Sequence, residues 1–330
     1  MLFVLILAAH PVGARVGAFI AGLSLAVPCF VWAPPLSRGL LMCVMCMPLA
    51  AATALVIVPP IAGFRARLAY LCTWCGRHQL NRQARRLDGT SLLRLIVATA
   101  VLAGATATVE SVSASGLQSF ARWFAGVIMV LAFAELATAS FPLVSTALGV
   151  TVPPLMQSPY RSASVGEFWT KRWNIFASEM VFRPICFAPL ARRSRILGLS
   201  AAFALSALVH VLLALMALGN WRSSLLFGAF FLVQPLLIIV ERRMHVRRWR
   251  PMAGRVWALS ALTLTSPLFV EPLLRILESS WGIQRNGLGP AIAVLGFVIA
   301  FSGFVSLASL VSVSGNNDVN QPAVPRHAGF

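Results

Sequence analysis

Long apolar runs, separated by short polar or basic intervals, recur along the chain and constrain its fold more than any other feature. Each run is close to the roughly 20 apolar residues that a membrane-crossing helix needs. The runs cover residues 16–32, 40–61, 92–109, 123–143, 196–218, 225–240, 256–270 and 290–311. The sequence therefore predicts an all-α protein, a multi-pass transmembrane helical bundle of about eight spans.

The composition excludes the main alternatives to a membrane protein. Of the 330 residues, 58% are hydrophobic and 11% are charged, whereas soluble domains average about 25% charged residues. Too little polar surface is left to cover a soluble core, and the chain is too apolar to be disordered. We expect one membrane-embedded domain over residues 1–313, followed by a polar tail over residues 314–330 that we predict to be disordered.

The net charge of +18 is distributed in a way that predicts topology. Of the 27 basic residues, 20 lie in three intervals, 65–94, 161–195 and 242–255, and two predicted spans separate each interval from the next. Cytoplasmic loops of membrane proteins collect Lys and Arg. We therefore predict that these three loops and both termini are cytoplasmic, in a bacterial inner membrane or an endoplasmic reticulum membrane. No aromatic-interleaved basic module suggests a nucleic-acid partner.

The cysteines do not form a recognisable metal site. Cys72 and Cys75 make a C-x-x-C pair beside His78, but two further ligands at a suitable spacing are missing from this region. We expect no metal and reduced, incidental thiols. The oligomeric state is left open.

Two titratable residues interrupt apolar runs and are candidates for chemistry, because burying such groups in a membrane is costly. His210 lies within residues 196–218 and Glu135 within residues 123–143. A neutral imidazole can act as a general base, but a packing histidine bonded to a backbone carbonyl is an equally simple interpretation. A transporter that relays protons between His210 and Glu135 is the alternative from another functional class.

The segment 167–182 is basic, aromatic and amphipathic. If it forms a helix, Trp169, Trp173 and Phe176 share an apolar face, while Lys171 and Arg172 are placed to contact phosphates. This predicts a cytoplasmic amphipathic helix or loop at the membrane surface. An interfacial anchor without chemistry remains the alternative.

The order of several motifs resembles one enzyme family. The string E-F-W-T-K-R-W-N, from Glu167 to Asn174, resembles the F-W-x-R-R-W-N signature of the wax synthase branch of the membrane-bound O-acyltransferase (MBOAT) family. In that family a buried histidine follows, here His210. Thr170 and Val211 depart from the pattern, which commonly has Gly and an acidic residue there. Further matches within about residues 150–275 are Ser164, Arg183, Pro184, Phe230, Phe231, Gln234, Glu241, Trp257, Thr263, Thr265, Pro267 and Pro272.

This resemblance implies acyl transfer from acyl-CoA, as co-substrate, to the hydroxyl of a lipophilic acceptor within the lipid bilayer. The acceptor is either a long-chain alcohol, giving a wax ester, or a natural-product hydroxyl that receives an acetyl group. His210 is then the general base, and Asn174 holds the thioester or stabilises the oxyanion; no cofactor is needed. Residues expected to bind acyl-CoA are Trp169, Lys171, Arg172, Trp173, Arg183 and Gln234.

Overall fold

A computed structural model describes residues 82–112, 116, 118–152, 154–281 and 288–314. Within these ranges every regular element is a helix, and the β pairing is limited to an isolated antiparallel bridge between Arg82 and Val150. The predicted all-α class is thereby confirmed. The predicted spans 16–32 and 40–61, the Cys72/Cys75 pair with His78, and almost all of the predicted tail lie outside the described residues.

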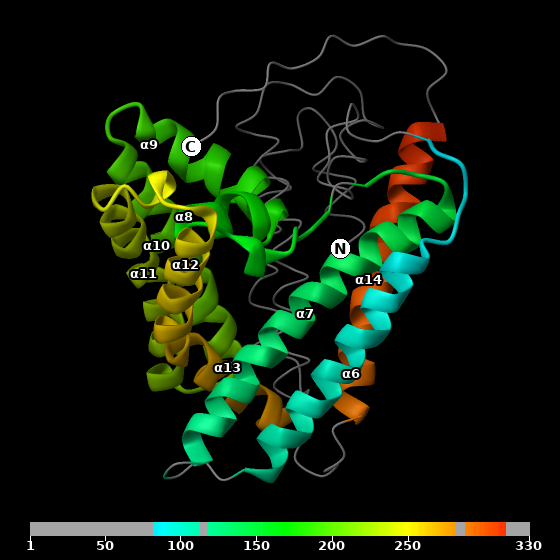
Figure 1. The fold of residues 1–330 in the computed structure, drawn as a ribbon, viewed down its shortest axis with the longest axis horizontal. Helices are drawn as coiled ribbons and strands as arrows, with labels where there is room; N and C mark the ends of the chain where they lie inside the picture. Colours follow the sequence, from blue (N-terminus) through cyan, green and yellow to red (C-terminus); the bar gives the residue numbers. More distant parts are fainter. Residues whose placement is uncertain (1–81, 113–115, 117, 153, 282–287, 315–330) are drawn as a thin grey trace.

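Five long helices dominate the structure (Figure 1): α6 (Gly89–Ser111), α7 (Gln118–Leu148), α10 (Arg195–Leu218), α11 (Trp221–Arg243) and α14 (Leu288–Ser314). Between α7 and α10 the chain makes only short segments: η2 (Pro159–Arg161), α8 (Val165–Glu167), η3 (Phe168–Arg172), η4 (Ala177–Phe187) and α9 (Ala188–Ala191). After α11 come η5 (Val246–Arg248), α12 (Pro251–Thr265) and α13 (Pro267–Trp281).

Four described helices, α6, α7, α10 and α11, are long and apolar enough to cross a membrane. They confirm the predicted spans 92–109, 123–143, 196–218 and 225–240, and the protein is an integral membrane protein. α14 covers the predicted span 290–311 and contains a shorter apolar stretch, Val294–Leu310. The described part of the chain holds four spans, or five with the bent pair α12 and α13, so the number of about eight stays a prediction.

The predicted span 256–270 is not one continuous helix. The chain bends by 53° between α12 and α13, at Ser266. Pro267 begins α13 and has no N–H to donate to the carbonyl four residues earlier, so the helical hydrogen-bond ladder is interrupted there, although Ser266 itself keeps helical φ and ψ. The Ser266 hydroxyl accepts a hydrogen bond from Trp123 Nε1 at 2.8 Å, so α7 is tied to the bend.

The segment 167–182, expected to be an amphipathic helix or loop, is not one continuous helix. It breaks after η3 at Trp173 and Asn174, where Asn174 has a φ of 40°. Asn adopts this left-handed conformation more readily than other residues with a Cβ. Its Oδ1 then accepts a hydrogen bond from Ala177 N at 3.2 Å, which caps the next helical segment. Phe176 consequently packs against Phe141, away from the predicted shared face.

The long helices form two groups that meet at α13. In Figure 1, α6, α7 and α14 lie together on the right and α9 to α12 lie on the left. α13 packs against α7 of the first group and against α10 and α11 of the second. One core cluster joins α6, α7 and α13, and another lies among α10, α11, α12 and the segment that begins α8.

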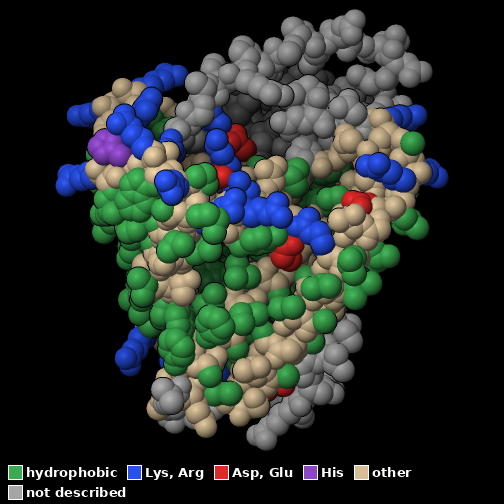
Figure 2. Space-filling model, in the orientation of Figure 1, with side chains coloured by type: hydrophobic (Ala, Val, Ile, Leu, Met, Phe, Trp, Pro, Cys, Tyr) green, Lys and Arg blue, Asp and Glu red, His purple; other side chains and the backbone are tan. Residues whose placement is uncertain are grey.

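Basic side chains gather over the upper part of the face shown in Figure 2, above a hydrophobic band. In the orientation of Figure 1 this is the end where α8, the start of α6 and the end of α11 lie. The described parts of all three basic intervals therefore lie toward one end of the bundle, as their spacing predicts.

We expect a cysteine that replaces the exposed Arg192 to react with a membrane-impermeant thiol reagent from the cytoplasmic side only. The matched control is Arg222, also exposed, which lies at the other end of α10 and α11 and should be labelled from the opposite side. Both variants require a background without the six native cysteines. Labelling of both positions from the same side would contradict the topology.

Candidate active site

The imidazole of His210 has a defined tautomer. Its Nδ1 lies 2.7 Å from the backbone carbonyl oxygen of Ser206, one turn earlier in α10. A carbonyl oxygen only accepts hydrogen bonds, so Nδ1 carries the proton and donates it. In the neutral ring, Nε2 then carries the lone pair. The backbone bond that a packing histidine would make therefore also prepares Nε2 to act as a base.

Local sequence signals place His210 opposite α11. Gly219 ends α10 with a φ of 63°, and the next residue, Asn220, caps α11 by accepting a hydrogen bond from Ser223 N. This tight turn makes α10 and α11 antiparallel neighbours. At Gly228 an added Cβ would lie 2.4 Å from Val211 Cγ2, so glycine is needed for the close approach beside His210.

Two phenylalanines of α11 hold the His210 ring. Phe231 stacks on it, with ring centroids 3.8 Å apart and an angle of 28° between the planes. Phe227 meets it edge to face, with centroids 5.3 Å apart. Such contacts restrict the rotation of the ring and give it an apolar setting.

Trp169 connects the loop segment to the helices that carry His210. Its indole Nε1 donates a hydrogen bond to Gln234 Oε1 at 3.1 Å. Its ring meets Phe231 and Phe203 with centroids 5.7 Å away in both cases. Because Phe231 also stacks on His210, one continuous aromatic cluster joins η3 to α10 and α11.

Gln234 is completely buried beneath this loop. Its Nε2 donates to the Phe230 carbonyl at 3.0 Å and to Thr265 Oγ1 at 3.4 Å, while its Oε1 holds Trp169. Both ends of the amide are thus engaged within the protein. Gln234, which the sequence analysis expects to bind acyl-CoA, thus holds the Trp169 indole in place.

Trp173 and Asn174 lie at the break between η3 and η4. The Trp173 ring stacks on Phe168, with centroids 5.3 Å apart, and packs against the core of α6, α7 and α13. The helix-capping bond of Asn174 uses its amide oxygen. The amide N–H group is therefore the part of this side chain that can donate to a substrate.

Glu241 anchors the start of this loop. It is 2% exposed, at the end of α11, and its carboxylate accepts hydrogen bonds from Val165 N at 2.5 Å and Gly166 N at 3.4 Å. Ser164 caps the same turn by accepting from Glu167 N at 2.9 Å. The resemblance gave Glu241 a structural or donor-site role rather than a chemical one, and in the structure its carboxylate caps α8 from the end of α11.

The Arg172 guanidinium forms hydrogen bonds with residues of its own loop. Its Nε donates to Glu167 Oε1 at 2.7 Å, and its Nη1 donates to the Gln157 carbonyl at 3.2 Å. Burial acts to raise the pKa of Glu167, but the Ala163 N–H and the Arg172 guanidinium outweigh it, so that this pKa lies below its ordinary value. Ionised Glu167 and Arg172 thus lock η3 in place.

The other predicted cations differ in their surroundings. Arg183 pairs with Glu179 one turn away, at 3.0 Å. Lys171 is exposed and lines a cavity of about 300 Å³ between η3 and the connection from α11 to α12. Arg247 and Arg250 line the same cavity. Sequence reasoning missed these two arginines, because only the folding of α8 against α12 brings the second and third basic loops together.

The close approach of α12 to the loop depends on a glycine. An added Cβ at Gly254 would lie 2.4 Å from the Ala163 carbonyl oxygen, so a larger residue would push α12 away from the cavity.

Within the described residues no cluster of three or more His, Cys, Asp or Glu side chains is arranged to hold a metal ion.

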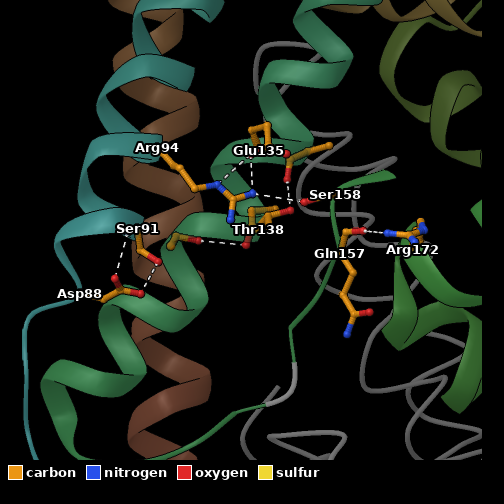
Figure 3. A network of polar contacts seen from close by, with 11 residues as sticks. Asp88, Ser91, Arg94, Glu135, Thr138, Gln157, Ser158 and Arg172 are labelled. Carbon is orange, nitrogen blue, oxygen red and sulfur yellow. Dashed lines mark hydrogen bonds and ion pairs between the residues drawn. The ribbon is translucent and has the colours of Figure 1, made fainter. Parts of the chain in front are cut away.

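Glu135, the second titratable residue within a span, is part of a separate polar network (Figure 3). Arg94 of α6 donates to Glu135 Oε2 of α7 through Nε at 3.2 Å and Nη2 at 2.6 Å. Arg94 Nη2 also lies 3.5 Å from Ser158 Oγ, next to the Gln157 carbonyl that Arg172 contacts. The network therefore links the first pair of helices to the loop.

The central part of the chain, which carries Asn174 and His210, matches a known family. A family model described as "Membrane bound O-acyl transferase family" matches residues 152–233. The match confirms the resemblance found in the motifs of this segment. The segment contains Asn174, His210 and the aromatic cluster.

Similar proteins with curated names include three from Arabidopsis thaliana. "Probable long-chain-alcohol O-fatty-acyltransferase 2" is 31% identical over 169 residues, which make up 47% of each chain. "Probable long-chain-alcohol O-fatty-acyltransferase 1" is 28% identical over 48% of this chain and 49% of its own length. The similarly named protein 3 is 28% identical over 40% of this chain and 43% of its own. The matches thus span about half the length of these relatives, and no solved structure matches the chain significantly.

Proposed function

We propose that this protein is an acyl-CoA-dependent O-acyltransferase that forms wax esters from long-chain alcohols. The observation that carries the proposal is the His210 Nδ1–H bond to the Ser206 carbonyl, which leaves Nε2 as a base within the matched family segment. The relatives are named as probable long-chain-alcohol O-fatty-acyltransferases, and these names support the choice of acceptor.

The proposed reaction uses groups of this chain alone. His210 Nε2 takes the proton of the alcohol hydroxyl as its oxygen attacks the thioester carbonyl. The Asn174 amide N–H donates to the oxyanion that develops, an interaction worth ~3–4 kcal/mol when well placed. The carbon–sulfur bond then breaks, the proton passes to the departing sulfur, and the products are an ester and the free thiol of coenzyme A.

The proton-relay transporter has less support. A relay needs hydrogen bonds or water that connect its titratable groups. In the described structure His210 is bonded to the Ser206 carbonyl on α10, whereas Glu135 is paired with Arg94 between α6 and α7. The two residues thus belong to separate networks.

The decisive experiment supplies the purified full chain, in lipid nanodiscs, with palmitoyl-CoA or acetyl-CoA and with hexadecanol. We expect an ester of hexadecanol together with an equal amount of free coenzyme A. Ester formation with acetyl-CoA alone would favour the acetyl-transfer alternative. The absence of any ester or coenzyme A release with a range of alcohols would contradict the proposal.

Lys171 and Arg172 are adjacent but are expected to respond differently to neutralisation. Lys171→Met should raise the KM for acyl-CoA about tenfold, the equivalent of ~1.4 kcal/mol, because Lys171 faces the basic cavity. Arg172→Met should mainly lower the Tm, since its partners are Glu167 and Gln157. The measurement is steady-state kinetics beside thermal unfolding, with Arg192→Met as the exposed control.

A donor without the nucleotide separates phosphate binding from other effects of these changes. For acyl-pantetheine, which lacks the nucleotide phosphates, Lys171→Met should leave KM unchanged. Equal increases in KM for both donors would show that Lys171 does not contact the nucleotide part of coenzyme A.

A further inference from the structure

The cavity that Lys171 lines is bordered by cations from two different basic intervals of the sequence. Lys171 comes from η3, whereas Arg247 and Arg250 come from the connection between α11 and α12. The packing of α8 against α12 brings these segments together, and the two helices lie beside each other in Figure 1. The volume of about 300 Å³ is at the lower end of the ~300–1,000 Å³ range of small-molecule sites. The cavity therefore has room for part of a ligand.

The acidic residue that lines the cavity is held by other partners. Glu167 Oε1 pairs with Arg172 Nε at 2.7 Å, and Glu167 Oε2 accepts a hydrogen bond from Ala163 N at 2.8 Å. In the described part of the chain, Lys171 and Arg250 are exposed and form no ion pair. Their two charges are therefore available to a ligand in the cavity.

Arg247 lines the cavity beside the buried Glu241. An added Cβ at Gly166 would lie 3.6 Å from Arg247 Nη2 and 3.3 Å from Glu241 Oε1, so the two side chains meet at this glycine. The charge of Glu241 offsets that of Arg247, but Lys171 and Arg250 keep the cavity positive. A cleft lined by charges of one sign concentrates ligands of the opposite sign. The charge distribution thus favours an anion with more than one charged group.

An aromatic side chain lines the same cavity. Trp249 is 38% exposed, and its ring meets that of Trp257 with centroids 6.4 Å apart and an angle of 73° between the planes. Exposed aromatic rings stack on nucleobases. Cations beside an exposed indole therefore fit a nucleotide better than a lipid headgroup, which has no planar ring.

The distance from the cavity to His210 matches the reach of coenzyme A. Phe231 stacks on His210, and Glu241 binds the backbone of the α8 segment that borders the cavity. These two residues of α11 are ten positions apart, which corresponds to ~15 Å along a helix. The pantetheine arm of coenzyme A joins its sulfur to the diphosphate through about twelve bonds, as many as four extended peptide residues contain, or ~14 Å. A thioester at His210 therefore places the diphosphate at the cavity.

We propose that this cavity binds the 3′-phospho-ADP part of acyl-CoA, with Lys171 at the diphosphate and Arg247 and Arg250 at the 3′-phosphate. The inference rests on the proposed function in taking acyl-CoA as the donor. Lys171 follows Trp169 of the aromatic cluster by two residues, so the end of the nucleotide that carries the pantetheine arm lies on its side of the cavity. Arg247 and Arg250 lie outside the family-matched segment 152–233 and are assigned from geometry alone. The cavity thereby distinguishes acyl-CoA from thioesters that carry pantetheine phosphate alone.

The test measures the binding of coenzyme A and of dephospho-coenzyme A, which lacks only the 3′-phosphate, to the purified full chain in phosphatidylcholine nanodiscs. In isothermal titration calorimetry we expect coenzyme A to bind about tenfold more tightly. Arg250→Met should weaken the binding of coenzyme A about tenfold and leave that of dephospho-coenzyme A unchanged, which also shows that the variant is folded. Lys171→Met should weaken the binding of both. The matched control is Arg248→Met, because Arg248 is an exposed arginine of η5 that does not line the cavity.

Calorimetry requires no acyl transfer, so its result is independent of whether the chain forms esters. Equal binding of the two ligands, or an equal loss of both in Arg250→Met, would overturn the assignment of the 3′-phosphate, and ester formation from palmitoyl-CoA would then leave the proposed function intact. The expected binding pattern without ester formation would support the nucleotide site and contradict the proposed function.

A lipid headgroup is the other source of the same phosphate chemistry. Phosphatidic acid carries a phosphomonoester, as the 3′-phosphate does, whereas phosphatidylserine carries a phosphodiester. We expect the addition of either lipid to the nanodiscs to change the affinity for coenzyme A equally. A selective, about tenfold loss of affinity with phosphatidic acid that is absent in Arg250→Met would assign the cavity to a lipid headgroup and overturn the proposal.

Discussion

Replacement of His210 by glutamine is expected to lower kcat by at least the ~10²–10⁴-fold that a positioned general base contributes. Glutamine keeps a polar side chain of similar length between Phe231 and the Ser206 carbonyl, but it has no lone pair of useful basicity. His210→Ala should be equally inactive. The measurement is ester formation under saturating donor and alcohol, together with size-exclusion chromatography to show that the variant is folded.

A matched control tests whether the hydrogen bond or the Ser206 side chain matters. Because His210 Nδ1 contacts the backbone carbonyl of Ser206, Ser206→Ala retains this bond and should keep most of the activity. Substantial activity in His210→Gln would show that the residue has a structural role, and the proposed mechanism would then be wrong. Loss of activity in Ser206→Ala would point to a role for the hydroxyl that the geometry does not predict.

Replacement of Glu241 by alanine is expected to cause the largest loss of stability. It removes the acceptor of the Val165 and Gly166 N–H groups, and each buried donor left without a partner costs roughly 1–3 kcal/mol. The start of α8 would also detach from α11 and carry η3 with it, so kcat should fall as well. Thermal unfolding followed by size-exclusion chromatography measures the first effect, and ester formation measures the second.

Glu241→Gln should lie between the parent and Glu241→Ala, because its amide oxygen can still accept one of the two bonds. Glu179→Gln is the control, since Glu179 is exposed and pairs with Arg183 within one helical segment. We expect little change in that variant. A Tm in Glu241→Ala equal to that of the parent would show that Glu241 does not hold the loop.

Hydropathy alone predicted α6, α7, α10 and α11, because a long apolar run has few alternatives to a membrane-spanning helix. Residues 256–270 and 167–182 do not form continuous helices, because in each segment one residue changes the direction of the backbone. Pro267 follows the bend between α12 and α13, and Asn174 breaks the amphipathic segment. Both residues were visible in the sequence, but periodicity does not show whether the surrounding helices accept a break.

Site residues were predicted unevenly for a related reason. His210 and Asn174 could be named because a titratable residue in an apolar run and a family-like motif are local signals. The partners were not local: Trp169 with Gln234, Glu241 with Val165, and Lys171 with the cavity shared by Arg247 and Arg250. The sequence spacing did not predict that Arg172 forms an ion pair with Glu167, whereas Lys171 remains exposed at the cavity.

The sequence by itself thus determined that the chain is helical, that it is embedded in a membrane, and which family its central segment resembles. These properties depend on the residue types within each segment of the chain, because polar side chains and unpaired backbone groups are costly to place in lipid. The tertiary structure decided the tautomer of His210, the cap that holds α8, and the pairing of Arg94 with Glu135 beside an apolar groove. Each of these requires a distance between atoms of packed elements, and such distances exist only once the helices have packed.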